Sequence, residues 1–282
     1  MEAKGNPWDI PEWHFIRQEA MLVRHLIGAG ATAIGQANYA NKKGEYYRAF
    51  FELSVGMERL AKLILVVDYA LTHSGKLPDE KHVRQFGHDL KSLFTAVDHV
   101  STTRTLNLLY PRPTDPVATA IIDNLDAFAD AKRGRYANFA ALGNPKNDQH
   151  EPVSKWWSEV AEEILRQKHV GKRIEQLKAK QAAAAQPLLG KAIVVGVHTE
   201  TRSLIPDFQT AVMRSGQAEL VQKWARFHVL TIVRWLAETY AELADVAAYK
   251  HGFDAFWESW DFFSCFRAPD SDLKKYKVWP ER

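Results

Sequence analysis

One helical stripe constrains the fold more than any other feature of the sequence. Apolar residues recur at alternating intervals of four and three between positions 46 and 71, which places them on one side of an α-helix. They are Tyr46, Phe50, Leu53, Met57, Leu60, Ile64, Val67 and Leu71. Because Leu63, Leu65 and Val66 widen the stripe in its last turns, we predict a central core helix whose end is nearly surrounded by protein.

A second stripe of the same period lies in the C-terminal region. Its members are Ala225, Val229, Ile232, Leu236, Tyr240, Leu243 and Ala247. His251-Gly252 predicts the end of this helix, and Asp115 before Pro116 predicts a capped helix start. Shorter helices are expected over Pro11–Ala40, His88–Val100, Pro116–Ala131 and Pro152–Gln181.

The fold class predicted from these patterns is all-α, an up-and-down helical bundle with additional C-terminal helices. Ala192–Val197 is the only run with strand character, and one short run cannot form a sheet. The alanine-rich segment Lys180–Gln186 reads as a helix end or linker. We therefore expect a bundle over residues 1–182 and a helical extension packed on it over 183–282, or a single domain containing both.

Composition excludes several classes of protein. Among 282 residues, 46% are hydrophobic and the formal net charge is +3, which is typical of a globular chain without a large basic excess. Cys265 is the only cysteine, so neither an internal disulfide nor a cysteine metal cluster can form, and we expect no metal and no cofactor. With no apolar leader and no apolar run long enough to span a bilayer, we predict a cytoplasmic protein without a membrane segment.

Three further patterns have structural explanations that we prefer to functional ones. Gly28, Gly30 and Gly35 favour close helix packing over a phosphate-binding loop, because no strand precedes them. The basic run Arg166–Lys180, with Ile174 and Leu177 turned inward, favours a solvated helix face. Its functional alternative is non-specific attraction of phosphate. The paired tryptophans 156-157 and 257-260 favour core or interface packing over base stacking.

Two stretches indicate a binding site. In Phe86–Leu90, Asp89 can cap the following helix and His88 stands beside it. The second stretch contains two arginines separated by glycine, followed by a tyrosine and an asparagine: Arg133, Arg135, Tyr136 and Asn138. These side chains can hold a phosphate by paired hydrogen bonds, or the arginines can simply stabilise the end of a helix.

The order of these motifs resembles the HEPN superfamily of helical bundles. The resemblance covers residues 39–142 and rests on three groups of residues: Glu52, Glu58 and Lys62 on the first stripe, then Gly87-His88-Asp89-Leu90 and Leu93, then Arg133, Arg135, Tyr136 and Asn138. It implies a bundle of four to five helices. Many members are metal-independent ribonucleases of toxin–antitoxin and phage-defence systems, and many are dimers with the site at the interface. Their signature is an arginine, four to six residues, and a histidine.

The chain departs from that signature, because Arg133 is followed by Asn138 where the family has histidine. Asparagine can bind a phosphate but cannot carry a proton near neutral pH. The resemblance therefore implies a homodimeric protein that binds RNA or nucleotide phosphate in a prokaryotic defence or stress system, through Arg133, Arg135, Tyr136, Asn138 and Asp89. Two alternatives stay open: a non-catalytic module that binds a partner protein, and an active endoribonuclease using His88.

Overall fold

The fold is all-α, as the two stripes predict. The computed structural model describes residues 7–38, 42–130, 151–189, 196–197, 204–205, 207–214 and 216–279. The helices of the first half are α1 (Pro11–Ile34), α2 (Gly44–Thr72), α3 (Glu80–Gln85), α4 (Leu90–Thr103) and α5 (Pro116–Ala129). Those of the second half are α7 (Pro152–Trp156), α8 (Glu162–Lys168), α9 (Arg173–Leu189), α10 (Phe208–Arg214), α11 (Gln217–Asp245) and α12 (Asp270–Lys275).

Short irregular pieces complete the described architecture. A single π-helical turn joins α7 to α8 and another extends α11. Single 3₁₀ turns cover Pro7–Asp9, Asp254–Phe256, Ser259–Asp261 and Ser264–Phe266. Gly196–Val197 (β1) and Leu204–Ile205 (β2) form one antiparallel two-residue ladder. Part of the run predicted to have strand character, residues 192–195, lies outside the described residues.

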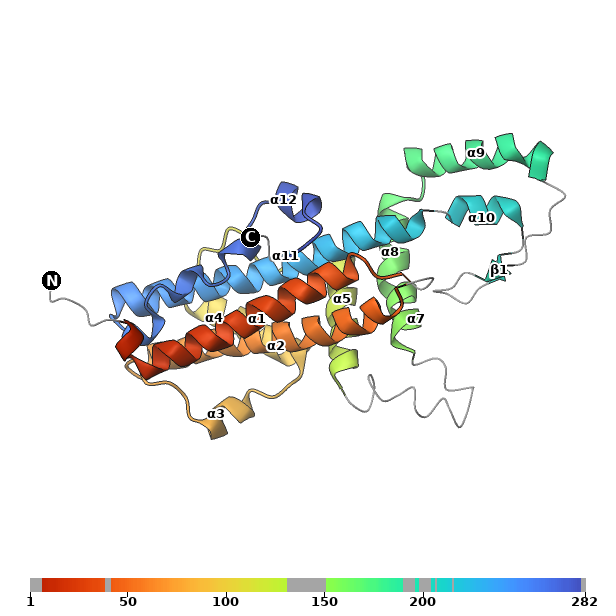
Figure 1. The fold of residues 1–282 in the computed structure, drawn as a ribbon. Helices are drawn as coiled ribbons and strands as arrows, with labels where there is room; N and C mark the ends of the chain where they lie inside the picture. Colours follow the sequence, from red (N-terminus) through yellow and green to blue (C-terminus); the bar gives the residue numbers. More distant parts are fainter. Residues whose placement is uncertain are drawn as a thin grey trace, which may run out of the picture.

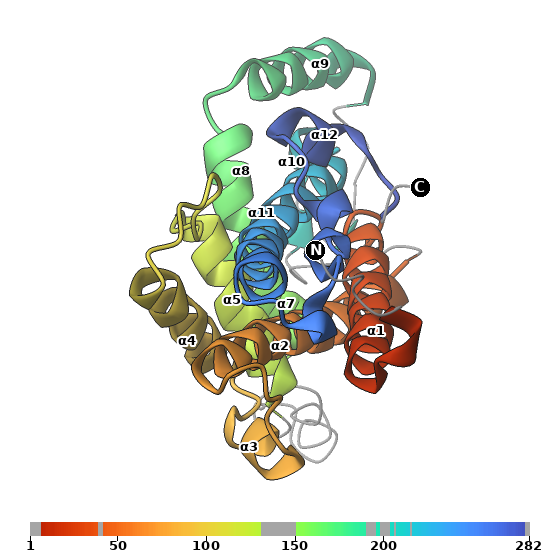
Figure 2. The same cartoon turned by 90° about the vertical axis from the view of Figure 1, so that its left-hand side faces the viewer.

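Three long helices, α1, α2 and α11, lie side by side and form the centre of the molecule (Figure 1). The end-on view in Figure 2 shows α1 on one side of α11, and α5 and α4 on the other. The helix most completely surrounded by protein is α11, in which most side chains are buried. At the end of α2, Leu63 is buried as expected, whereas Leu65 and Val66 are only partly buried.

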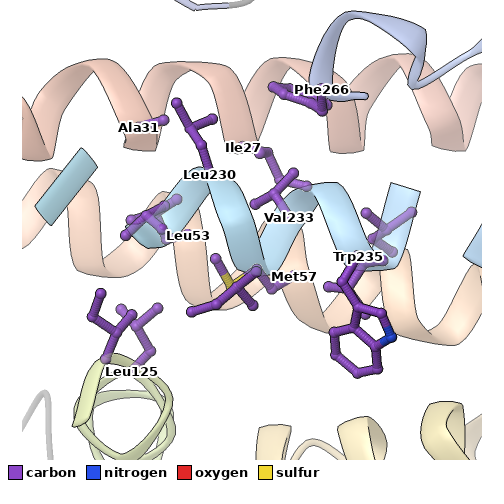
Figure 3. Packing of buried hydrophobic residues seen from close by; sticks show 14 of the residues in the cluster. Ile27, Ala31, Leu53, Met57, Leu125, Leu230, Val233, Trp235 and Phe266 are labelled. Carbon is purple, nitrogen blue, oxygen red and sulfur yellow. The ribbon is translucent and has the colours of Figure 1, made fainter. Parts of the chain in front are cut away.

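The predicted stripes form the core where the three helices meet (Figure 3). Met57 of α2 and Val233 of α11 are fully buried there. Glycine allows α1 and α2 to approach closely, since a methyl group built at Gly30 would lie 2.7 Å from Cγ of Leu53. This confirms a helix-packing role for Gly30, and the buried Trp156 and Trp157 confirm a core role for that pair.

Helix starts agree well with the sequence. Asp115 Oδ1 accepts hydrogen bonds from the backbone N–H groups of Val117 and Ala118, both at 3.1 Å. The end predicted at His251-Gly252 is also observed, because the π-helical turn that extends α11 ends at Lys250. Both signals are local, so they do not depend on the rest of the fold.

The segment after residue 152 differs most from the prediction. One helix was expected over Pro152–Gln181, but the chain turns between α8 and α9. Leu177 was expected to face inward and is 48% exposed, because α9 packs mainly on α10 and lies away from the central helices (Figure 1). Lys180–Gln186 lies inside α9 and is not a linker.

Both predicted parts of the chain contribute to one hydrophobic core. It contains residues of α1, α2, α4 and α5 together with residues of α11 and α12. Trp260, by contrast, is 36% exposed on a 3₁₀ turn and is not core. Within the described ranges, no helix combines the length and the apolar character needed to cross a membrane.

Candidate anion-binding site

The histidine of the first motif lies on the surface, beside α2. Its Nδ1 atom is 2.8 Å from Oε1 of Glu58, and 83% of the His88 side chain is exposed. The same Glu58 oxygen is 2.8 Å from Nζ of Lys62, which is the ion pair expected from their spacing on a helix. The structure therefore brings His88, Glu58 and Lys62 together in one polar cluster.

Asp89 has a structural role. Its Oδ1 atom accepts a hydrogen bond of 2.6 Å from the backbone N–H of Ser92 and so caps α4. The next residue, Leu90, donates its backbone N–H to Oδ1 of Asp126 on α5 at 2.9 Å. These two bonds fix the loop with His88 against the last turns of α5. The other predicted phosphate ligands, Arg133, Arg135, Tyr136 and Asn138, lie outside the described residues.

A different arginine stands out in the described part of the chain. Arg226 lies on α11 and is only 3% exposed. Its guanidinium lies against the end of α1, where a methyl group built at Gly35 would be 2.5 Å from Nη1. Among the described residues, Nε of Arg226 has no hydrogen-bond partner. Burial lowers the pKa of the guanidinium, and no carboxylate of the described residues offsets that effect.

A second buried arginine on the same helix, Arg234, has hydrogen-bond acceptors and a counter-charge. Arg234 donates to the carbonyl oxygen of Ala268 at 3.0 Å and to Oδ1 of Asp270 at 2.8 Å. Its guanidinium carbon also lies 3.8 Å from the centre of the Tyr110 ring. Two turns of helix separate this arginine from Arg226, yet only Arg234 has a described counter-charge.

Arg226 borders a cleft of about 990 Å³ between the end of α1 and the segments around α11 and α12. Six cationic side chains line it: Lys42, Lys223, Arg226, Lys274, Lys275 and Lys277. Glu219 is the one carboxylate among its described lining residues. Lys274 is held 3.2 Å from Oδ2 of Asp270, whereas Lys275 and Lys277 are exposed to solvent.

Burial of the Arg226 guanidinium has an energetic cost that its described contacts do not offset. Removing a charged group from water costs several kcal/mol when no partner compensates it. The carbonyl end of α1, which carries partial negative charge, can return only about 0.3–1 kcal/mol. A phosphate group in the cleft could accept two parallel hydrogen bonds from Arg226 and gain from the surrounding lysines as well.

This cleft is absent from the sequence-based expectations, which placed the phosphate site at Arg133 and Arg135. Its cations come from three separate stretches of the chain, so no short motif contains them. One signal was present. Apolar residues surround Arg226 and Arg234 on α11 in such number that neither arginine could easily face solvent.

The chain matches no family model, no curated protein and no solved structure. The HEPN resemblance and the roles of Arg133, Arg135, Tyr136 and Asn138 accordingly stay predictions.

Proposed function

We propose that the protein binds the phosphate groups of RNA or of a nucleotide in the cleft at Arg226. One observation carries the proposal: Arg226 is buried, has no described counter-charge and opens onto a cleft lined by five lysines. The ligand class agrees with the one implied by the HEPN resemblance, although the site differs. A role in a defence or stress system remains part of this proposal and rests on the resemblance alone.

The composition of the cleft favours a ligand with more than one negative charge. Six cations and one carboxylate line the cleft, and even with Lys274 paired to Asp270 the local field is positive, although the whole chain carries only +3. A single phosphate could engage Arg226 but would leave most of the lysines without an anion. Successive phosphodiesters or an oligophosphate would use them, and binding would then weaken steeply with salt.

The test uses the full chain and two probes, a nucleoside triphosphate and a twelve-nucleotide single-stranded RNA. We expect Arg226→Gln to weaken binding by about ten- to hundredfold, because a charged hydrogen bond contributes roughly 1.5–3 kcal/mol. Arg59→Gln is the matched control, since Arg59 pairs with Glu19 at 2.6 Å on another face. Isothermal titration calorimetry at fixed salt measures both variants. Equal affinities of wild type and Arg226→Gln, or no binding of either probe, would contradict the proposal.

Substituting two exposed lysines of the cleft tests phosphate binding without a change in the core. The double variant Lys275→Gln with Lys277→Gln should lower the slope of log affinity against log salt by about 1.4–1.8, because each lost phosphate contact removes about 0.7–0.9. The control removes two exposed lysines near α3, Lys76 and Lys81, and should leave the slope unchanged. An unchanged slope in both variants would remove these lysines from the site.

The same experiment distinguishes the two alternative functions, an endoribonuclease and a protein-interaction module. RNA cleavage that survives a chelator and disappears in His88→Ala would favour the endoribonuclease, with Glu58 holding Nδ1 of His88. Absence of RNA and nucleotide binding would favour the protein-interaction module.

A further inference from the structure

A partly exposed tryptophan borders the cleft. Trp224 lies on α11, two residues before Arg226, and its ring is surrounded by cations. The Nζ atoms of Lys223 and Lys274, which both line the cleft, are 5.9 and 5.8 Å from the ring centre. On α8, Nζ of Lys168 is only 4.3 Å from it. The ring therefore lies between the cleft and the basic run of α8 and α9.

The basic run continues the positive surface of the cleft past this ring. Lys168 is a member of the run, and Lys172, in the turn after α8, is exposed. Nζ of Lys178 lies near the start of α11, 3.9 Å from where a methyl group on Gly216 would be. Figure 1 shows α8 and α9 at the end of the molecule where α11 begins. The sequence favoured a solvated helix face for this run. Its position next to the cleft agrees with the functional alternative, attraction of phosphate.

The ring of Trp224 packs against a buried aromatic side chain. Phe227, which is buried, meets it edge to face, with ring centres 5.5 Å apart and planes at 88°. The lysine contacts are favourable cation–π interactions, which occur on protein surfaces without any ligand. A fixed aromatic ring among cations is also what single-stranded nucleic acids use, because each base can stack on the ring while its phosphates bind the cations.

We infer that the phosphate ligand is a single-stranded nucleic acid rather than a free nucleotide, with a base stacked on Trp224. The inference rests on the proposed function, because the same strand would place phosphates in the cleft at Arg226. A nucleotide could fill the cleft but would leave Lys168 and Lys172 unused. A strand that passes over Trp224 engages the cleft and the basic run together.

Chain length and the ring are tested with three probes: a nucleoside triphosphate and single-stranded RNAs of three and twelve nucleotides. We expect the twelve-nucleotide RNA to bind at least tenfold more tightly than the other two, and to quench tryptophan fluorescence. Trp224→Leu should weaken its binding about tenfold, because stacking on one aromatic ring has about that value. Trp224→Phe should retain most of the affinity. Trp8→Leu is the control, since Trp8 is 56% exposed at the N-terminal end and also faces an arginine, Arg17.

A second variant, on α8, keeps the inference testable if Trp224→Leu fails to fold. Lys168→Gln should weaken binding of the twelve-nucleotide RNA and leave the triphosphate unaffected. If Trp224→Leu and Lys168→Gln both bind every probe like wild type while Arg226→Gln loses them, this inference is overturned and the proposed function stands. If Arg226→Gln also binds like wild type, the proposed function itself fails. Equal affinity for the triphosphate and the twelve-nucleotide RNA likewise overturns the inference.

Discussion

Side chains in the centre of this molecule cannot be replaced by charged ones without loss of stability. Met57 is fully buried on α2, and Figure 3 shows it in the same cluster as Val233 of α11 and Leu125 of α5. Its position on the first stripe follows from spacing alone, because a period of three and four residues defines one helix face before any neighbour is known.

Met57→Asp should therefore prevent stable folding. A carboxylate at this position would have no cation beside it, and burying it would cost several kcal/mol, comparable to the whole stability of a domain. Met57→Leu keeps the volume and should cost less than about 1.5 kcal/mol. Thermal unfolding followed by circular dichroism compares the two. An aspartate variant that melts within a degree or two of wild type would show that the site is not packed as described.

At the scale of the elements, the ends of helices matter as much as their faces. Asp115 caps α5 and also lies 3.3 Å from Nδ1 of His228 on α11, so one carboxylate orders a helix start and faces a second helix. Burial lowers the pKa of His228 despite this carboxylate. The histidine is consequently neutral in the folded protein near pH 7, and the cap is the main function of Asp115.

Asp115→Ala should lower the free energy of unfolding by about 1 kcal/mol, because two backbone N–H groups at the start of α5 lose their acceptor. Asp115→Asn should retain most of that stability, since its side-chain oxygen can still accept. Chemical denaturation at pH 7 measures both. Equal losses in the two variants would mean that the negative charge of Asp115 matters more than its hydrogen bonds.

Elements with local signals could be predicted from the sequence, and those without could not. The starts at Asp115 and Asp89 need only the cap and the residues that follow it. The turn between α8 and α9 is an exception: Gly171 there has a φ of +69°, a usual helix stop, but the helical pattern that continues past it favoured a single helix. Leu177 faces solvent for a related reason: the face that a helix buries depends on its neighbour, and α9 contacts α10 rather than the central helices.

The candidate site belongs to the scale of the whole molecule. Its cations come from the stretch after α1, from α11 and from the region of α12, so they meet only when the chain is folded. The sequence-based search looked for charged residues close together in sequence and found His88, Arg133 and Arg135. Only the packed structure shows that Arg226 is buried without a described counter-charge.

Ligand binding should stabilise the entire fold. A ligand that binds only the folded state at one hundred times its dissociation constant adds about 2.7 kcal/mol to the free energy of unfolding. Inorganic triphosphate, at ionic strength matched with sodium chloride, should therefore raise the melting temperature of wild type by several degrees. Differential scanning fluorimetry should show a much smaller rise in Arg226→Gln. The same rise in both proteins would point to a non-specific salt effect.

The contact of Gly35 with Arg226 has a consequence for how sequences with this fold can change. The missing side chain at position 35 leaves room for the Arg226 guanidinium, whose burial without a described counter-charge opposes stability. A small apolar residue at 226 would relieve that strain, and alanine at 35 would then fit. Selection for stability alone would favour both replacements, so Gly35 and Arg226 are the pair that the proposed anion site would retain at the expense of stability.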